Sequence, residues 1–388
     1  MIKNAGIERA RGYAEANEKA IHLYKEIITK EGISCQFEEL PSFLYTTKEE
    51  GVQKLKKEAE AVRTLGIHAE YVRGDQIREL PFGVMAALKF ERQAQFHPLE
   101  FIKAIAKKLT IYEHTKVLKV DERFVVTEKG VVVADNVIFA AHYPFLITPG
   151  YYFLRQHQSR SYAVALKGEG VPERLYGMYY GIDRDGLSFR SADGQLILGG
   201  CSHRTGKPYH IESKRKEDKG KGAMCHLREQ AKNYYPKAVE SAYWAAQDCM
   251  PHDGIPFIGR FSILHENWYV ATGFQKWGMT TAMVSAMIIS DAILGRENPW
   301  KDVFSPQRCL VRAGYKHFCI DAWESIAGLS KGLFVKKELR CSHMGCALSW
   351  NKEEESWDCS CHGSRYTKDK ELLDDPAQMP LVKNNADK

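Results

Sequence analysis

The 388-residue chain has no stretch of about eighteen consecutive apolar residues, the length that a transmembrane helix needs. We therefore predict no membrane-spanning segment. Its first thirty residues carry charges throughout, unlike the apolar core of a secretory signal, so we expect a cytoplasmic protein. With 44% hydrophobic and 27% charged residues, the chain can form one large core or two or three domains.

Cysteines are few, and most of them are isolated. Six of the ten stand alone in the sequence: Cys35, Cys201, Cys225, Cys249, Cys309 and Cys319. Isolated cysteines are typical of a reducing compartment, and their scatter argues against a secreted fold that is held by disulfides.

Excess positive charge is modest, at +6, and the densest basic run is Lys214-Arg215-Lys216, followed by Lys219 and Lys221. A solvated surface loop is the simplest interpretation of this run, and an acidic docking partner is the alternative. We expect no nucleic-acid partner.

Hydrophobic periodicity predicts mixed helices and strands over the first three quarters of the chain. Helices are expected at residues 1–30, 48–65, 98–109, 223–235 and 279–294. Strands are expected at residues 43–45, 111–120, 124–127, 131–140, 160–166, 187–190, 195–198 and 268–271. The run 131–140 is almost entirely apolar, which predicts a strand buried on both faces. Residues 300–340 are less regular, so we interpret them as a connection to a C-terminal part.

The strongest chemical signal is a pair of cysteine-histidine boxes, Cys341-Ser-His343-Met-Gly-Cys346 and Cys359-Ser-Cys361-His362-Gly-Ser364. One cysteine and one histidine from each box can hold a [2Fe–2S] cluster, with two thiolates on one iron and two imidazoles on the other. Neutral imidazoles leave such a cluster less negative, so its reduction potential rises. The alternative is a tetrahedral zinc site, but zinc ligand pairs usually have two to four residues between them, and here one residue separates Cys341 from His343.

Over about residues 340–381 these boxes resemble the Rieske iron–sulfur domain. The resemblance implies that the cluster ligands are Cys341, His343, Cys359 and His362. It also implies a disulfide between Cys346 and Cys361, and hydrogen bonds from the hydroxyl groups of Ser364 and Tyr366 to cluster sulfurs. Only residues 328–340 stand between the connecting segment and the first box, so the base sheet is expected to be short. Ser360 also replaces a usual proline.

Three further stretches are together similar to the FAD-dependent amine and D-amino-acid oxidoreductase family, which includes glycine oxidase and sarcosine oxidase. They are residues 137–144, 253–260 and 271–280, and the resemblance spans about residues 1–297. It implies a mixed α/β (α+β) flavin domain that is fused to the small all-β Rieske domain, as in bacterial oxidoreductases of the Rieske-fused type. The flavin contacts that it implies are Val117, Ala140, Ala141, Gly273, Phe274, Trp277, Gly278, Met279 and Thr280.

Two departures from that family affect the cofactor and the substrate. The sequence has no G-x-G-x-x-G fingerprint for the FAD pyrophosphate, so we expect that the chain lacks the first part of the FAD domain and holds FAD poorly alone. Asp248 stands where amino-acid oxidases of the family place an arginine for the substrate carboxylate, so a simple amino acid is not the expected substrate. Our candidates for a substrate pocket are Gln247, Asp248 and Arg190. We interpret His203 and Tyr180 as structural or surface groups.

The expected organisation is an oxidoreductase domain over residues 1–297, a linker over 298–335 and a Rieske domain over 336–388. We expect a flavin to oxidise a small amine- or hydroxyl-bearing molecule and the cluster to relay electrons singly to an acceptor protein or quinone. The alternative is a non-catalytic Rieske electron-transfer protein, or one part of a split enzyme. A Rieske oxygenase would need two histidines and a carboxylate on a mononuclear iron, and Asp248 and His252 have no second histidine near them in the sequence.

Overall fold

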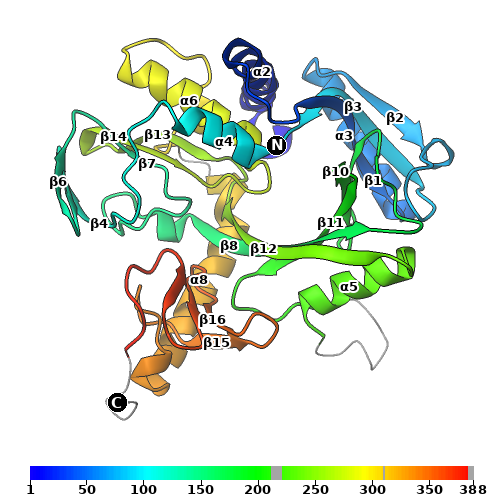
Figure 1. Cartoon of the computed structure of the whole chain (residues 1–388). Helices are drawn as coiled ribbons and strands as arrows, with labels where there is room; N and C mark the ends of the chain where they lie inside the picture. Colours follow the sequence, from blue (N-terminus) through cyan, green and yellow to red (C-terminus); the bar gives the residue numbers. More distant parts are fainter. Residues whose placement is uncertain (211–220, 309–310, 383–388) are drawn as a thin grey trace. The chain divides into compact units, whose positions relative to one another are not determined.

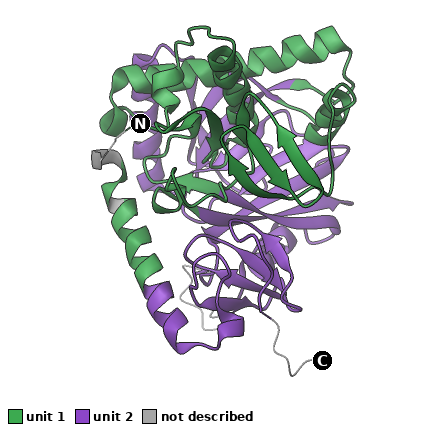
Figure 2. Ribbon diagram, turned by 90° about the vertical axis from the view of Figure 1, so that its left-hand side faces the viewer, with its two compact units in different colours: residues 1–38, 95–157, 249–326 green, residues 39–94, 158–248, 327–388 purple. Residues whose placement is uncertain are grey.

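The computed structural model describes residues 1–210, 221–308 and 311–382, so Lys214, Arg215, Lys216 and Lys219 of the basic run lie outside the described part. Its contacts divide the chain into two compact units, and each unit is assembled from three separate stretches of sequence (Figure 2). Unit 1 comprises residues 1–38, 95–157 and 249–326, and unit 2 comprises residues 39–94, 158–248 and 327–388. No helix within the described ranges is both long and apolar enough to cross a bilayer.

Unit 1 combines two three-stranded sheets with several helices (Figure 1). One sheet has the order β13-β14-β7, made of Phe257–Ser262, His265–Thr272 and Val137–Phe139. The other has the order β4-β5-β6, made of Val117–Asp121, Phe124–Thr127 and Gly130–Val133. The helices are α1 (Ile2–Ala5), α2 (Ile7–Glu31), α4 (Pro98–Ala106), α6 (Gly278–Ile293), α7 (Lys301–Phe304) and the first part of α8 (Val311–Phe334).

Helices α2 and α6 pack together and fix the start of α6. Ala16 and Ala20 are fully buried and share one apolar cluster with Val284 of α6, because small side chains let the two helices approach closely. The Tyr24 hydroxyl donates a hydrogen bond of 2.9 Å to the main-chain oxygen of Met279, in the first turn of α6. This contact ties the position of that turn to the buried face of α2.

Unit 2 is built around an eight-stranded sheet with the order β12-β8-β11-β10-β9-β1-β3-β2. In that order the strands are Val239–Pro251, Gln156–Lys167, Gln195–Arg204, Ser188–Ala192, Met178–Gly181, Glu38–Thr46, Ala86–Gln95 and Ala69–Arg73. Helices α3 (Glu49–Thr64) and α5 (Ala223–Tyr234) belong to the same unit. Strands β1 and β9 pair in parallel, and the ladders from β9 through β10 and β11 to β8 are antiparallel.

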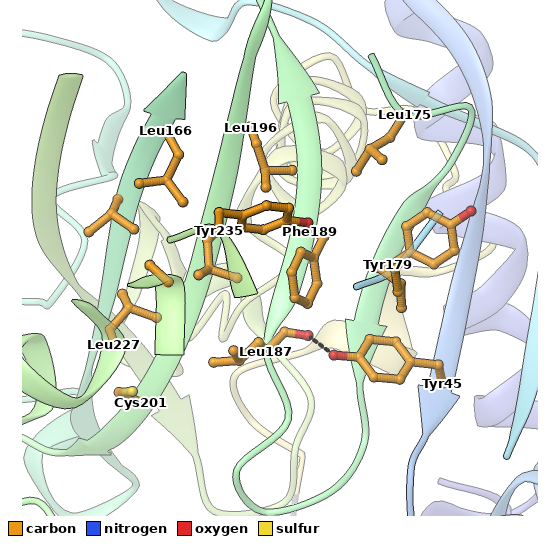
Figure 3. Packing of buried hydrophobic residues seen from close by; sticks show 14 of the residues in the cluster. Tyr45, Leu166, Leu175, Tyr179, Leu187, Phe189, Leu196, Cys201, Leu227 and Tyr235 are labelled. Atoms are coloured by element: carbon orange, nitrogen blue, oxygen red, sulfur yellow. Dashed lines mark hydrogen bonds between the residues drawn. The ribbon is translucent and has the colours of Figure 1, made fainter. Parts of the chain in front are cut away.

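The main core of unit 2 lies on one face of this sheet (Figure 3). Tyr179, Phe189 and Leu196 point into it from three adjacent strands, and Leu227 of α5 joins the same cluster. Tyr45 keeps its polar end satisfied, because its hydroxyl donates a hydrogen bond of 2.8 Å to the main-chain oxygen of Leu187. Since strand side chains alternate between faces, the residues next to these in sequence lie on the opposite face.

A small antiparallel sheet completes unit 2 with the order β15-β16-β17-β18. Its strands are Leu348–Asn351, Ser356–Cys359, Arg365–Thr367 and Leu372–Asp374, and the short helix η4 (Lys337–Leu339) comes before them in the chain. Each strand pairs with the next along the chain, so the connections are short turns. All four strands come from one stretch of sequence, residues 348–374.

Three expectations about secondary structure are wrong. The run 111–120 is a strand only from Val117, where β4 begins. The apolar run 131–140 is not one buried strand: it divides into β6 and β7, and Val131, Val133 and Ile138 are 57%, 64% and 47% exposed. The polar residues Asp135 and Asn136 break the run, so its apolar side chains do not share one buried environment. The connecting segment, expected to be irregular, contains α8, a helix of 24 residues whose glycines weaken the helical signal in the sequence.

Candidate functional site

The two cysteine-histidine boxes form two loops of similar construction. In the first, the Cys341 N–H donates to the Cys346 carbonyl and the Gly345 N–H donates to the Cys341 carbonyl, both at 2.8 Å. In the second, the N–H of Cys359 donates to the carbonyl of Ser364 and the N–H of Gly363 to the carbonyl of Cys359, both at 2.9 Å. Each loop thus has a pair of main-chain hydrogen bonds that turns its ligand-bearing residues inward.

Glycine is required in both loops for a conformational reason. Gly345 and Gly363 have φ angles of 83° and 90°, in the region that side chains with a Cβ rarely adopt. A Cβ at Gly363 would also lie 2.6 Å from the Cβ of Gln158. The second loop therefore depends on glycine both for its turn and for its close approach to strand β8.

The loops bring the four predicted ligands together, with Cys341, Cys359 and His362 buried and His343 partly exposed. Cys341 and Cys359 are 3% and 1% exposed, and the rings of His343 and His362 are perpendicular with centroids 5.1 Å apart. The Nδ1 atom of His343 is buried and has no hydrogen-bond partner among the described residues, as expected of a nitrogen that binds a metal. The donor set therefore fits a mixed thiolate–imidazole cluster.

The protonation states of the predicted ligands also favour metal binding. Burial lowers the pKa of His343 to about 4, so its imidazole is neutral near pH 7 and can ligate. A hydrogen bond from the Cys359 thiol lowers the pKa of the Cys341 thiol to about 6, and a bond with the Tyr366 hydroxyl acts in the same direction. The Cys341 thiol is therefore easier to deprotonate than an ordinary cysteine thiol.

Cys346 and Cys361 lie in disulfide contact in the structure, with Cα atoms 6.9 Å apart. Their sulfur atoms also lie close to a ligand, since those of Cys346, Cys359 and Cys361 are all within 4.8 Å of one another. A bond between the spare cysteines would hold the two loops together around the metal. Their oxidation state stays a prediction, which a count of free thiols will test.

The two predicted hydroxyl donors are fully buried beside the ligands. Tyr366 Oη lies 3.3 Å from Cys341 Sγ and accepts a hydrogen bond of 3.0 Å from the Ser342 N–H. Ser364 Oγ accepts one of 3.0 Å from the Ala377 N–H. Since a hydroxyl that accepts from an N–H keeps its own proton to donate, both groups can donate to sulfur.

We expect the Tyr366→Phe variant to have a lower cluster reduction potential, because a hydroxyl that donates to sulfur stabilises the added negative charge. One hydrogen bond contributes about 0.5 to 1.5 kcal/mol, which for a one-electron couple is about 20 to 60 mV. A redox titration followed by EPR would measure the shift. The exposed Tyr176→Phe serves as the control, and equal potentials in the two variants would contradict the role of Tyr366.

The second box is held by side chains from the eight-stranded sheet. Gln158 Nε2 donates to the carbonyls of His362 (3.1 Å) and Asp375 (2.8 Å). Arg204 donates from Nε to the Ser360 carbonyl at 2.8 Å and from Nη2 to the Cys361 carbonyl at 2.9 Å. These bonds reach the main chain of consecutive residues around a predicted ligand, so they fix where His362 lies.

Buried charges reinforce this anchoring. The Glu354 carboxylate, which follows β15, accepts hydrogen bonds from Arg160 Nε at 2.6 Å and from the Tyr162 hydroxyl at 2.9 Å. The neighbouring Glu353 accepts from the N–H groups of Met224 and Cys225 at the start of α5. A carboxylate at a helix N-terminus is favoured by the free N–H groups there.

Most of the implied flavin contacts gather at one edge of the β13-β14-β7 sheet. Strands β14 and β7 are parallel, with Val270 opposite Phe139, so both end at the same edge. Ala140 and Ala141 follow β7 there and are exposed. Gly273 follows β14 with φ 75°, and a Cβ on it would lie 2.6 Å from Cγ of Pro251, so only glycine fits.

The turn after Gly273 leads into α6. Phe274 is half-buried against the cluster between α2 and α6, and Trp277 and Met279 are 52% and 42% exposed. Gly278 begins α6, and the side chain of the N-cap residue Trp277 makes no capping hydrogen bond to the first turn. Its N–H groups are therefore available to an electron-rich edge of a ligand. Thr280, in the same turn, donates to the carbonyl of Trp277 at 3.5 Å.

Val117 lies apart from that edge, at the start of β4, where it packs against the apolar cluster around Phe139. The described residues thus fit the flavin end of a binding site. The G-x-G-x-x-G run that would hold a pyrophosphate is absent from the sequence.

The candidate substrate residues do not all serve one purpose. Gln247 accepts a hydrogen bond of 2.6 Å from the Thr205 hydroxyl and donates one of 3.2 Å to the Gly363 carbonyl, so it supports the second box. Asp248 accepts from the Ser161 hydroxyl at 3.0 Å, and its charge contributes, after burial, to a raised pKa of Tyr180.

Arg190 lies on β10 next to Phe189, on the face of the sheet opposite the core. Burial lowers its pKa. Tyr180 lies on the same face, because its partner Ser188 is two residues from Arg190. His203 instead stacks on Tyr162, with ring centroids 5.7 Å apart. A polar face with Tyr180, Arg190 and Asp248 is the remaining candidate for substrate binding.

Sequence reasoning missed one group of metal-ligand side chains. His157, His252 and Asp321 have ligand atoms that all lie within 4.8 Å of one another, so His252 has in space the second histidine that it lacks nearby in the sequence. The three residues come from β8, the end of β12 and α8, and no sequence spacing brings them together. It also missed the anchors Gln158 and Arg204, whose side chains have no motif around them.

Comparison with known proteins agrees with this architecture. The FAD dependent oxidoreductase family model matches residues 4–292, and the Rieske [2Fe-2S] domain model matches residues 321–384. YhfW of Bacillus subtilis strain 168, provisionally named a Rieske 2Fe-2S iron-sulfur protein, is 31% identical, over 100% of this chain and 83% of that protein.

Two solved structures illustrate the fold. Glycine oxidase from Geobacillus kaustophilus aligns with a TM-score of 0.62 and 17% identity, over 76% of this chain and 82% of that one. L-proline dehydrogenase from P. horikoshii aligns with a TM-score of 0.61 and 18% identity, over 79% of this chain and 83% of that one. At these identities the likeness establishes the fold alone.

A mixed α/β flavoenzyme fold joined to a small β domain with two cysteine-histidine loops defines the class of Rieske-fused oxidoreductases. The chain belongs to the FAD dependent oxidoreductase family, and its C-terminal part is a Rieske [2Fe-2S] domain.

Proposed function

We propose that the chain oxidises a small amine- or hydroxyl-bearing molecule with a bound flavin and passes the electrons singly to an acceptor through a Rieske cluster. The observation that carries this proposal is the combination of a buried two-cysteine, two-histidine ligand set with a family fold that uses FAD. A flavin converts two-electron into one-electron chemistry, and a cluster accepts one electron at a time. We expect the acceptor to be a protein or a quinone.

The chain's own residues would divide the work. The cluster would be held by Cys341, His343, Cys359 and His362. The predicted disulfide between Cys346 and Cys361 would hold the two loops together. The turn from Gly273 into α6 would approach the flavin with main-chain N–H groups, which favour negative charge at that end. On this proposal the fold supplies orientation and electrostatics, while the cofactors supply the redox chemistry.

The nature of the polar face narrows the substrate class. Asp248 stands beside Ser161 and Tyr180, so a substrate carboxylate would meet a negative group there. A cationic amine, or a hydroxyl that donates to Asp248, suits this face better. Arg190 lies on the same face and would pair with an acidic group of the substrate, if the substrate has one at a distance from its amine or hydroxyl.

A second candidate function is a Rieske electron carrier that works without flavin. The missing G-x-G-x-x-G run favours it, since nothing else in the sequence is recognisable as a pyrophosphate cradle. In that case the fold would serve as a support for the cluster, and electrons would come from a partner protein.

Reconstitution of the full chain separates the two candidates. We expect one [2Fe–2S] cluster per chain with the EPR spectrum of mixed histidine and cysteine ligation, and well under one FAD per chain after gel filtration. Adding excess FAD and scanning amines and alcohols anaerobically should then reduce the cluster in the presence of substrate. Cluster formation with no bound FAD and no reduction would support the carrier, and absence of the cluster would contradict both functions.

A further inference from the structure

His157, His252 and Asp321 form a compact group inside unit 1. The Asp321 Oδ2 atom lies 2.9 Å from Nδ1 of His157 and 2.5 Å from Nε2 of His252. The side chains of Asp321 and His252 are 9% and 8% exposed, and that of His157 is 21% exposed. Two imidazoles and one carboxylate thus converge where water has limited access.

The three ligand atoms have the separation that a metal ion imposes. With metal–ligand bonds of about 2.1 Å, neighbouring ligand atoms around an octahedral ion are on the order of 3 Å apart. The two nitrogen–oxygen distances are close to this value, and all three atoms lie within 4.8 Å of one another. A bound ion would need only small movements of these side chains.

Each member of the group comes from an element whose position is fixed by other contacts. The His252 main-chain N–H donates to the Arg155 carbonyl at 3.0 Å, which ties the end of β12 to the residues before β8. On α8, the ring of Phe318 lies edge-on to His252 with centroids 6.1 Å apart, and Gly314 permits close packing against the His252 side chain. The group therefore has the supporting contacts that hold metal ligands in place.

The carboxylate that follows His252 in the sequence is already engaged. Asp253 follows His252 directly, and Arg308 donates to its two oxygens from Nε at 2.8 Å and from Nη2 at 2.9 Å. This buried ion pair holds Asp253, so the candidate ligands among the described residues are His157, His252 and Asp321. Three ligands leave coordination positions on a metal open to water or to an exogenous molecule.

We propose that His157, His252 and Asp321 form a mononuclear site for a divalent first-row transition metal, with positions open to an oxygen or nitrogen donor. Imidazole together with carboxylate suits Fe²⁺, Co²⁺ or Zn²⁺ better than Mg²⁺ or Ca²⁺, which prefer oxygen ligands alone. The site is distinct from the cluster ligands, which all lie in unit 2.

The site adjoins the turn that the family resemblance assigns to the flavin. Gln156 precedes His157, and Pro251 precedes His252. A Cβ on Gly273 would lie 2.6 Å from Cγ of Pro251 and 3.1 Å from Oε1 of Gln156. The Gln156 side chain also donates to the Thr272 hydroxyl at 3.1 Å. A metal on the two histidines would therefore brace the strands on which this turn rests.

Cobalt binding tests the proposal in the full chain with its cluster in place, so that the cluster cysteines do not bind added metal. We expect one Co²⁺ per chain beyond the cluster iron, measured by elemental analysis after gel filtration, with visible absorption bands of bound cobalt. Asp321→Asn and His157→Gln should each weaken cobalt binding by at least about 100-fold, since each removes a direct ligand. His22→Gln, which changes an exposed histidine of α2, should bind as the wild type does.

The outcomes decide the proposal without reference to flavin. Absence of cobalt binding in the wild type would overturn it and would leave the group as a hydrogen-bonded clamp on α8. Equal affinity in His157→Gln, His22→Gln and the wild type would also overturn it. If Asp321→Asn fails to fold, as judged by its cluster spectrum, the more exposed His157→Gln decides alone.

Discussion

The Cys359→Ser variant is expected to purify without a [2Fe–2S] cluster. Cys359 is 1% exposed, at the end of β16, and is one of only two thiolates in the predicted ligand set. A serine hydroxyl stays protonated near pH 7 and cannot replace a thiolate on iron. Iron and sulfide per chain should fall from about two each to near zero, with loss of the visible absorption and of the EPR signal on reduction.

A matched variant and a thiol count complete this test. Cys225→Ser changes an exposed cysteine in α5 and should keep the full cluster. Retention of a cluster by Cys359→Ser would mean that Cys346 or Cys361, whose sulfurs are within 4.8 Å of Cys359, can replace the ligand. In that case the predicted ligand set is wrong. Free thiols counted in the denatured, unreduced protein should be two fewer than the ten cysteines if the spare pair is bonded.

The Arg365→Met variant is expected to lose about 3 to 5 kcal/mol of unfolding free energy, since it leaves the buried carboxylate of Asp358 without its paired cation. The Arg365 side chain is 6% exposed and pairs with Glu354 at 2.8 Å, Asp358 at 3.0 Å and Asp374 at 3.0 Å. Asp358 is 3% exposed, so its charge has no access to water after the change.

Urea unfolding followed by tryptophan fluorescence would measure this loss, because Trp350 and Trp357 lie in the same small sheet. Arg11→Met is the control: Arg11 pairs with Glu8 at 2.9 Å, but the side chains are 38% and 79% exposed. Exposed pairs contribute about 0 to 1 kcal/mol, so this variant should stay near the wild type. A loss of similar size in both variants would contradict the role assigned to the buried network.

Acid should weaken the same network. Burial opposes ionisation of Glu354, but hydrogen bonds and attraction from Arg160, with the charge of Arg365, lower its pKa overall below the usual 4.5. A carboxyl whose pKa is lower in the folded state adds stability above its unfolded pKa, and this is lost as the pH falls through the folded value. The wild type should therefore lose stability below about pH 4.5, and Arg365→Met should lose less there.

The sequence predicted the ligand set well because the two boxes are local. Each box closes on itself through main-chain hydrogen bonds and a glycine, so the spacing of Cys341 and His343 reflects geometry that needs no distant partner. The end of α2 was predictable for the same reason, since Gly32 has the left-handed φ of 60° that ends helices.

Contacts between residues that are far apart in the sequence could not be predicted from the sequence. Asp321 reaches His157 and His252 only because α8 forms and packs on the end of β12, and the glycines of α8 weaken its helical pattern. Gln247 was expected in a substrate pocket, and only the folded sheet places it against the Gly363 carbonyl. The apolar content of residues 131–140 likewise predicted that they are buried. Burial also requires other parts of the folded chain to pack against them, and the sequence does not show this.

If the proposed function holds, the hydrogen bonds from Gln158 and Arg204 to the second box have a consequence for how electrons leave the protein. Rather than being tethered only by a flexible linker, this loop is fastened at several successive main-chain carbonyls to strands β8 and β11. It therefore cannot swing out by itself, and any approach to an acceptor must carry the eight-stranded sheet along with it. The acceptor would therefore have to bind close to the cluster. The rate of electron delivery would then depend on the encounter between the two molecules and not on motion of the cluster loop on a flexible linker.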